Sequence, residues 1–195
     1  FYLLLYKISL KKSFHNFFQN KYDYRFFKIK KIISSNASII PGSGFNFSKT
    51  LKIKLPSKKE INFLFIGRLL IDKGIREYLT SANNILSNTK YKNVNFHIVG
   101  DYDKSSTRNI DQSSFSRFIS NNNIYFHGYQ SNLDKIFEEN HCVVLPSYRE
   151  GLSHSLLTAC SFSKALIVSN VPGCNELVID NVESEAQANG SMDLP

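Results

Sequence analysis

The sequence predicts an α/β fold with a doubly wound parallel sheet. Short apolar runs alternate with segments in which apolar residues recur at helical spacing. Most of the apolar runs end at a glycine or a proline, which stops a strand and begins a loop. Strands that alternate with helices along a chain usually pair in parallel and carry helices on both faces of the sheet.

The first half of the predicted sheet comes from residues 61–126. The apolar run Ile61–Ile66 stops at Gly67 and predicts a buried strand. Between residues 75 and 86, apolar residues recur at i, i+3, i+4, i+7, i+10 and i+11, which predicts a helix with one apolar face. The next expected elements are a strand, a helix and a strand at Val94–Val99, 108–120 and Ile124–Phe126.

Residues 127–182 continue the alternation. The expected elements are a helix at 133–137, a strand at Cys142–Leu145, a helix at 152–162 and a strand at 165–168. Ligands of doubly wound sheets bind at the carboxyl ends of the strands, near helix N-termini. The residues that directly follow each strand are therefore the candidates for a functional site.

The segments outside this domain differ from it in composition. Residues 48–60 (SKTLKIKLPSKKE) predict a polar linker between residues 1–47 and the domain at 61–182. Residues 183–195 contain no lysine, isoleucine or phenylalanine, and we expect them to form an atypical, disordered tail that is foreign to the fold.

The positive charge is concentrated in the first third of the chain. Residues 1–60 hold 13 lysines and arginines against 2 acidic residues, a net charge of +11, whereas residues 61–195 hold 11 against 14, a net charge of −3. The basic part can be an ordinary lysine-rich surface, a face for an anionic membrane, or a nucleic-acid surface. No zinc-finger, ribonucleoprotein or helix-turn-helix motif accompanies the charge, so we expect no nucleic-acid partner.

Other classes of protein are excluded by composition. No apolar run reaches the roughly 18–20 residues that a membrane-spanning helix needs. The cysteines form no Cys-x-x-Cys pair and lack histidines at zinc-finger spacing, so we expect reduced thiols at Cys142, Cys160 and Cys174. Histidines on or beside the predicted strands are expected to be structural, namely His97, His127 and His141.

Two cations follow the first predicted strand. In the segment Phe65-Ile-Gly-Arg-Leu-Leu-Ile-Asp-Lys-Gly74, Arg68 lies on the loop after Gly67, and Lys73 precedes the helix. A guanidinium offers two parallel donors and an ammonium a compact charge, so both can bind one pyrophosphate beside a helix N-terminus. The alternative is a solvated loop with ordinary charges.

A carboxylate follows the strand that ends at Pro146. Glu150 and Gly151 precede the predicted helix, and a glycine there lets the backbone approach a ligand closely. Free backbone N–H groups at the start of a helix can hold an anion. The alternative is that Glu150 is an acidic N-terminal cap of the helix.

These segments resemble the retaining glycosyltransferases of family 4, which have the GT-B fold of two facing Rossmann-like domains. The family's G-R-L-x-x-x-K-G motif is present as Gly67-Arg-Leu-Leu-Ile-Asp-Lys-Gly74, and its P-S-x-x-E-G motif as Pro146-Ser-Tyr-Arg-Glu-Gly151. A V-P-G-x-x-E segment follows as Val171-Pro-Gly-Cys-Asn-Glu176. Upstream, Phe18-Gln-Asn20 and Ile40-Pro-Gly-Ser-Gly44 resemble the crossover region of bacterial polysaccharide-building members.

The resemblance implies a role for each matching residue. Arg68 and Lys73 would bind the donor diphosphate and stabilise charge on the departing nucleotide, which is electrostatic catalysis. Glu150 would hydrogen-bond hydroxyls of the donor sugar, so these three are the expected catalytic residues. The remaining expected contacts to the nucleotide sugar are Gly67, Gly128, Tyr129, Gly151, Leu152, Ser153 and Thr158.

Thr158 departs from the family pattern. Members usually carry a second glutamate eight residues after the first, where it contacts the ribose hydroxyls, but here that position is Thr158. No aspartate or glutamate lies between Gly151 and Asn175 to replace it. The departure favours weaker donor binding.

The resemblance implies a Rossmann-like, doubly wound parallel sheet that is the C-terminal half of a truncated GT-B enzyme, with residues 1–47 a remnant of the acceptor-side domain and crossover. The implied activity is that of a retaining hexosyltransferase with a UDP- or GDP-sugar donor, no metal or other cofactor, and a polysaccharide or polyprenyl-linked acceptor. The implied location is cytoplasmic, in peripheral contact with the inner face of the cell membrane. Alternatives are a catalytically impaired nucleotide-binding fragment and a nucleotide-sugar epimerase.

Overall fold

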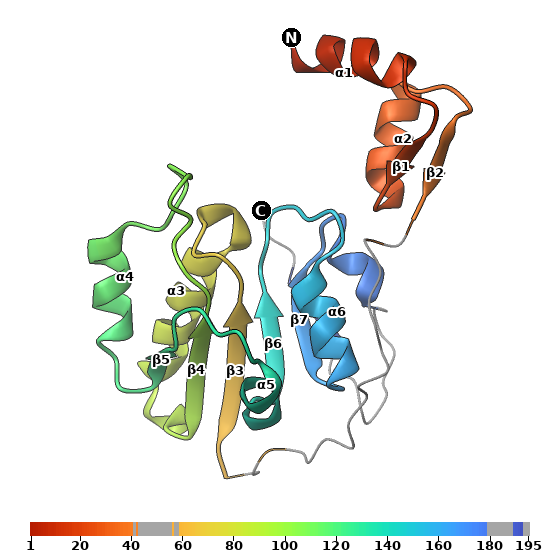
Figure 1. Ribbon diagram of the computed structural model, residues 1–195. Coiled ribbons are helices and arrows are strands. Elements are labelled where there is room, and N and C mark those ends of the chain that lie inside the picture. The colour runs from red at the N-terminus through yellow and green to blue at the C-terminus, as the bar shows by residue number, and fades with distance from the viewer. Residues whose placement is uncertain (41, 43–55, 57–58, 179–188, 193–195) are drawn as a thin grey trace.

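A computed structural model describes residues 1–40, 42, 56 and 59–178, together with the backbone of residues 189–192. Its main unit is a six-stranded sheet in which all neighbouring strands are parallel. The strands are β3 (Ile61–Ile66), β4 (Val94–Val99), β5 (Ile124–Phe126), β6 (Cys142–Leu145), β7 (Ala165–Ser169) and β8 (Asn189–Met192). The predicted α/β fold class is therefore confirmed (Figure 1).

The strand order makes the sheet doubly wound. From one edge to the other the strands run β5-β4-β3-β6-β7-β8, so the chain leaves the centre in one direction, returns, and leaves it in the other. The reversal lies between β3 and β6, where Phe63 is in register with Cys142 and Leu64 with Val143. In open sheets of this kind the crevice for a ligand forms at that point, at the carboxyl ends of the strands.

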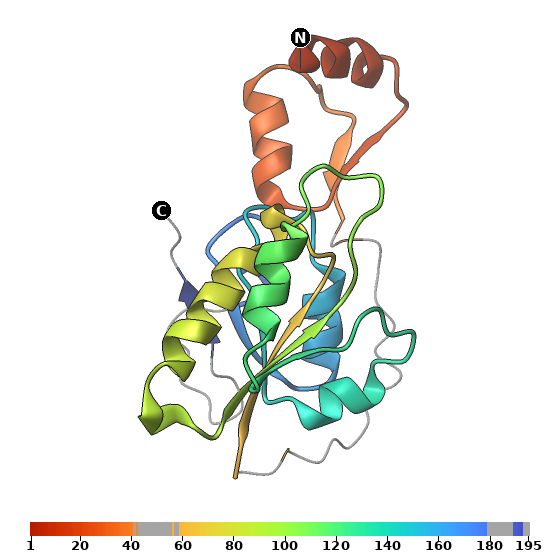
Figure 2. The same ribbon diagram turned by 90° about the vertical axis from the view of Figure 1, so that its left-hand side faces the viewer.

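Helices cover both faces of the sheet (Figure 2). One face carries α3 (Ile75–Leu86) and α4 (Gln112–Ile119), and the other carries α5 (Asp134–Glu139) and α6 (His154–Ser161). The described residues also form three short 3-10 helices, namely η2 (Ile71–Lys73), η3 (Thr89–Tyr91) and η4 (Asn175–Leu177). The crossover helices lie on opposite faces because right-handed connections in opposite directions must pass on opposite sides of the sheet.

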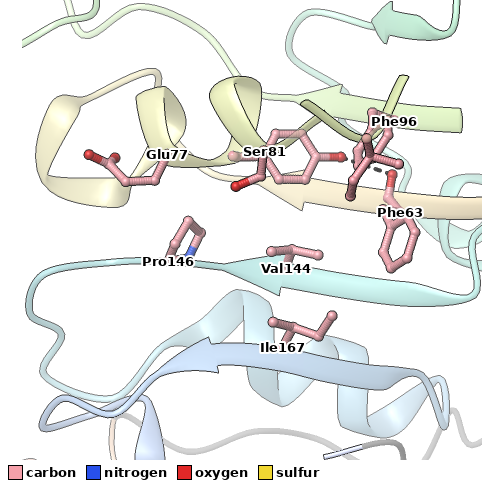
Figure 3. Close-up of a pocket in the computed structure, with 9 residues that line it drawn as sticks. Phe63, Glu77, Ser81, Phe96, Val144, Pro146 and Ile167 are labelled. Atoms are coloured by element: carbon pink, nitrogen blue, oxygen red, sulfur yellow. Dashed lines mark hydrogen bonds between the residues drawn. The ribbon is translucent and has the colours of Figure 1, made fainter. Parts of the chain in front are cut away.

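The core lies between the sheet and these helices. Tyr78 of α3 is buried against Phe65 and Phe96, and its hydroxyl donates to the backbone oxygens of Phe63 and His97 at 3.0 Å. Tyr78 also lines an apolar hollow of about 120 Å³ between α3 and the strands β3, β4, β6 and β7 (Figure 3). This hollow offers apolar side chains rather than groups that bind a charged ligand.

The N-terminal residues form a small unit whose helices and strands the sequence did not predict. It consists of α1 (Tyr2–Lys11), β1 (Asn16–Phe18), α2 (Lys21–Ile29) and β2 (Ala37–Ile39), with β1 parallel to β2. This unit lies beyond the carboxyl ends of the main sheet in both views (Figures 1 and 2). The sequence signal was absent because both strands are only three residues long and α1 buries no residue.

The predicted elements of the main unit agree with the observed ones in order and type, with three corrections. The helix expected at 108–120 spans Gln112–Ile119, because Asp111 caps it by accepting from the amide of Ser114. The last helix begins at His154 rather than at residue 152. Within the segment expected to be a disordered tail, residues 189–192 form β8, because an edge strand pairs through its backbone and does not need apolar side chains. Residues 183–188 and 193–195, and most of the expected linker at 48–60, lie outside the described residues.

In the described part of the chain, no helix combines the length and apolarity that crossing a bilayer requires.

We predict that Gly74→Ala strongly destabilises the fold. Gly74 has φ +74°, and a Cβ there would lie 2.0 Å from the backbone oxygen of Pro146, so alanine meets both left-handed strain and a clash between the β3 and β6 exits. Urea unfolding of the full 195-residue chain should show a loss of roughly 3 kcal/mol or more.

Gly128→Ala is the matched control. Gly128 has φ +65° but nothing within 4 Å of its added Cβ, so only the strain of roughly 1–2 kcal/mol is expected. Equal losses in the two variants would contradict the close approach at Gly74.

Candidate functional site

A cavity of about 350 Å³, lined by both polar and apolar side chains, lies at the carboxyl ends of β3 and β6. Seven predicted site residues line it: Gly67, Arg68, Lys73, Glu150, Leu152, Ser153 and Thr158. Five lining residues were not predicted: Ile66, Leu133, Leu145, His154 and Ser155. The reversal point of the sheet thus brings together side chains that are far apart in sequence.

The exit of β3 positions Lys73. After Gly67 the chain turns through η2, and the amide of Lys73 donates to Leu70 O at 3.0 Å. The backbone oxygen of Asp72 accepts from the amide of Tyr148 at 2.9 Å and from the hydroxyl of Ser147 at 3.0 Å. These bonds tie η2 to the loop after β6 and hold Lys73 at the wall of the cavity.

Lys73 and Glu150 form the central ion pair of the site. The Lys73 ammonium lies 2.5 Å from Oε1 and 2.6 Å from Oε2 of Glu150, so it donates to both carboxylate oxygens. The Lys73 side chain is 23% exposed and that of Glu150 is 10% exposed. Cys174 is buried nearby, and burial, followed by the charge of Glu150, raises the pKa of its thiol to about 12.

The segment after β7 supports the Glu150 loop through backbone hydrogen bonds. The amide of Glu150 donates to Pro172 O at 3.2 Å, and the amide of Ser153 donates to Gly173 O at 3.3 Å. Ser153, not Glu150, is the N-cap residue of α6, so the interpretation of Glu150 as a helix cap is wrong. The carboxylate of Glu150 points to Lys73 instead, while the first turn of α6 lines the cavity.

Arg68 also has a carboxylate partner. Its guanidinium donates to Oδ2 of Asp103 at 2.5 Å, from a side chain that is 60% exposed. Hydrogen bonds from the hydroxyl and amide of Ser105, and then from Arg68, hold the pKa of Asp103 below its usual range. Asp103 lies in the loop after β4 and was missed because no spacing in the sequence connects it to Arg68.

Three predicted site residues lie outside the wall of the cavity, and one lining hydroxyl is already bonded. Gly128 accepts through its oxygen from the amide of Gly100 at 2.9 Å, and Tyr129 is exposed. Gly151 packs against Gln19. Thr158 does line the cavity, but its hydroxyl donates to His154 O at 2.9 Å.

The histidines on the strands do not contribute a base to this cavity. His97 and His127 stack on each other, and Nδ1 of His97 lies 2.9 Å from Nε2 of His127. Burial, followed by the neighbouring His127, lowers the pKa of His97 to about 4. Burial also lowers the pKa of His127.

Among the described residues, no group of three or more histidine, cysteine, aspartate or glutamate side chains is placed to hold a metal ion. Two cationic side chains line the cavity, those of Arg68 and Lys73, and the first turn of α6 lines it beside them.

Comparison with known proteins identifies relatives of the whole domain. The sequence model of the family described as "Glycosyl transferases group 1" matches residues 47–192, which are 146 of the 195 residues. The N,N'-diacetylbacillosaminyl-diphospho-undecaprenol alpha-1,3-N-acetylgalactosaminyltransferase of Campylobacter jejuni is 27% identical over 186 residues, which cover 89% of this chain and 47% of that enzyme. The capsular polysaccharide biosynthesis glycosyltransferase CapM of Staphylococcus aureus is 27% identical over 116 residues, 60% of this chain and 30% of that protein. The chain thus spans less than half the length of these two relatives.

Solved structures show the same fold at low identity. Anabaena Alr3699/HepE in complex with UDP superposes with a TM-score of 0.78 at 13% identity, over 99% of this chain and 54% of that one. TarM superposes with a TM-score of 0.69 at 18% identity, over 97% of this chain and 35% of that one. These neighbours are GT-B glycosyltransferases, which confirms the predicted fold type.

We predict that Lys73→Met destabilises the chain more than Arg68→Met does. Removal of Lys73 leaves the poorly exposed carboxylate of Glu150 without its cation, which should cost about 2–3 kcal/mol in the free energy of unfolding. Arg68 is 60% exposed, and its partner Asp103 keeps the hydrogen bonds from Ser105, so its loss should cost about 0–1 kcal/mol. Urea unfolding at pH 7 measures both, and equal losses would show that the Lys73–Glu150 pair is effectively solvated.

Proposed function

The chain belongs to the group 1 glycosyl transferases, and on this premise we propose that it forms the donor-sugar site of a retaining hexosyltransferase of glycosyltransferase family 4. The observation that carries the proposal is the cavity at the reversal point of the sheet, which Arg68, Lys73 and Glu150 line together. Two cations and one carboxylate match the two parts of a nucleotide sugar, since the diphosphate is anionic and the sugar offers hydroxyl donors.

The ion pairs of the site support an exchange of partners on donor binding. Lys73 is bonded to Glu150 and Arg68 to Asp103, so each cation is held by a carboxylate. A diphosphate that takes Lys73 as its counterion releases the oxygens of Glu150 to accept hydrogen bonds from sugar hydroxyls. This exchange would leave the Lys73 ammonium against the phosphates and the Glu150 carboxylate on the sugar side of the cavity.

The proposed transfer breaks the bond between the anomeric carbon of the sugar and an oxygen of the β-phosphate. The electron pair of that bond stays on the phosphate oxygen, the acceptor hydroxyl oxygen forms the new bond to the anomeric carbon, and the acceptor proton leaves with the nucleoside diphosphate. Arg68 and Lys73 stabilise the charge that develops on the departing phosphate. No step of this scheme requires a metal ion, and we propose that none is used.

The names of the relatives support the class of substrates. HepE has been solved with UDP-glucose, which favours a UDP-sugar over a GDP-sugar as donor. The Campylobacter enzyme acts on an undecaprenol-linked diphospho-sugar and CapM in capsular polysaccharide biosynthesis, so we propose a polyprenyl-linked or polysaccharide acceptor. Such an acceptor favours a cytoplasmic protein in peripheral contact with the inner membrane face, for which the net charge of +11 in residues 1–60 offers an anionic-lipid contact.

A second candidate function is a nucleotide-binding domain with impaired catalysis. It is favoured by Thr158, which stands where the family has a glutamate and whose hydroxyl is bonded within α6.

We predict that the double variant Arg68→Ala, Lys73→Ala loses nucleoside-diphosphate binding. Each lost charge-assisted hydrogen bond costs about 1.5–3 kcal/mol, so affinity should fall about 100-fold or more. Isothermal titration calorimetry of the full chain with UDP and GDP measures this. The double variant Arg117→Ala, Lys135→Ala removes the same charges from exposed helix surfaces outside the cavity and should bind as the unmodified chain does. No binding of either nucleotide by the unmodified chain, or equal binding by both double variants, would sink the proposal.

We predict that Thr158→Glu strengthens nucleoside-diphosphate binding. Residue 158 lines the cavity one turn into α6, where a carboxylate can accept from ribose hydroxyls. One hydrogen bond to a charged group corresponds to about a 10-fold gain, so the variant should bind UDP about 10-fold more tightly than the unmodified chain does. Thr158→Gln, which has the same length without the charge, should gain less. Unchanged affinity in Thr158→Glu would contradict the ribose contact.

A further inference from the structure

Residues 19–23 of the N-terminal unit contact the Glu150 loop on both sides of Glu150. Nδ2 of Asn20 donates to the backbone oxygen of Gly151 at 3.1 Å. The guanidinium of Arg149 pairs with the carboxylate of Asp23, and it lies over the ring of Tyr22, 5.7 Å from the centroid. We propose that Asn20 is a positioning residue for Glu150, holding its loop so that the carboxylate faces the sugar side of the cavity. This inference rests on the proposed function.

Asn20 suits this role because it is buried and because both the oxygen and the nitrogen of its side-chain amide are hydrogen-bonded. Its side chain is almost fully buried, at 1% exposure. Oδ1 accepts from the amide of Asp23 at 2.7 Å and so caps α2, while Nδ2 donates to Oδ2 of Asp23 at 2.9 Å as well as to Gly151. The amide orientation is defined because the oxygen meets a donor and the nitrogen meets two acceptors. One side chain therefore couples the start of α2 to the residue that follows Glu150.

Gly151 permits the close approach of this segment. A Cβ at residue 151 would lie 2.1 Å from Oε1 of Gln19, closer than nonbonded atoms can come. Gly151 does not line the cavity. The contact with Gln19 therefore requires the glycine after Glu150, at a position that does not line the cavity.

A second contact anchors the same segment to the other support of the loop. The amide of Lys21, in the first turn of α2, donates to Oε1 of Glu176 at 3.2 Å. Glu176 belongs to η4, which follows Pro172 and Gly173, whose oxygens hold the amides of Glu150 and Ser153. The segments 19–23 and 172–176 thus bond to each other, and both also bond to residues 149–153.

This arrangement gives a role to two motifs that the proposed chemistry does not use. The Phe18-Gln-Asn20 and Val171-Pro-Gly-Cys-Asn-Glu176 segments supply no group to the cavity, yet both bond to the loop that carries Glu150. Loss of the Asn20 bridge should loosen Glu150 while leaving Arg68 and Lys73 in place. The affinity for the sugar part of the donor should then fall, and the affinity for the diphosphate part should not.

Asn20→Ser separates the bridge from the helix cap. A serine hydroxyl can still accept from the amide of Asp23 and cap α2, but it is too short to reach Gly151. Asn88→Ser is the matched control, since Asn88 caps η3 by accepting from the amide of Lys90 at 3.0 Å and lies outside the cavity.

The first measurement is amide hydrogen exchange of the unliganded full chain, followed by mass spectrometry. We expect faster exchange over residues 149–153 in Asn20→Ser and no change there in Asn88→Ser. Unchanged exchange over 149–153 in Asn20→Ser overturns the positioning role, whether or not the chain binds a nucleotide.

The second measurement is the ratio of the affinities for UDP-glucose and UDP by calorimetry. We expect Asn20→Ser to lower this ratio about 10-fold with the affinity for UDP unchanged, the loss of one hydrogen bond to a charged group. A ratio equal to that of the unmodified chain overturns the inference but leaves the proposed function intact. Absence of UDP and GDP binding in the unmodified chain defeats the proposed function, and the exchange measurement then decides the positioning role alone.

A rescue pair keeps the inference testable if Asn20→Ser does not fold. Gly151→Ala should lower the same ratio because its Cβ displaces Gln19 and with it the segment that carries Asn20. Adding Gln19→Ala removes the clashing atoms and should restore the ratio, since the nearest Gln19 atom that remains, Cβ, is 3.8 Å away. Failure of the second substitution to restore the ratio would show that Gly151 acts on the ligand directly.

Discussion

The parallel pairing of β3 with β6 is the interaction on which the site depends. The two strands are neighbours through Phe63 with Cys142 and Leu64 with Val143, although about 80 residues separate them. Their exits therefore leave the same edge of the sheet side by side, and Gly74 lets them pack closely against Pro146. Lys73 from one exit and Glu150 from the other meet only because of this pairing.

Charge compensation is the second constraint on the site. The cavity is lined by two cations, and each of them has a carboxylate partner. Lys73 is paired with a residue of the site itself, whereas Arg68 is paired with Asp103 from a neighbouring loop. Such pairs lower the cost of burying charge before a ligand arrives, and they make ligand binding an exchange of partners. The Lys73–Glu150 pair is the less exposed of the two and thus the one whose exchange matters more to the energy.

The N-terminal unit and the segment after β7 support the site without entering it. Their contacts reach the loop at 149–153 from two sides, through the side chains of Asn20 and Asp23 and through the backbone of residues 172 and 173. These contacts from two sides explain why a loop between a strand and a helix can hold the Glu150 carboxylate in a defined direction. A loop held only by its own ends would leave Glu150 many orientations.

The sequence by itself determined the order and type of the main elements, because each strand is an apolar run ended by glycine, proline or a polar loop, and the long helix α3 has a clear apolar face. It also identified Arg68, Lys73 and Glu150, since these residue types follow strands at motif spacing. It did not reveal the helices and strands of the N-terminal unit, where the strands are short and α1 buries no residue, or β8, whose segment Asn189–Met192 contains no apolar run. Only the tertiary structure decided that Glu150 faces Lys73 instead of capping α6, that Asp103 holds Arg68, and that Asn20 holds Gly151. These are contacts between residues 35, 77 and 131 positions apart, and no local pattern encodes them because they depend on how the strands pair and where the loops between them come together.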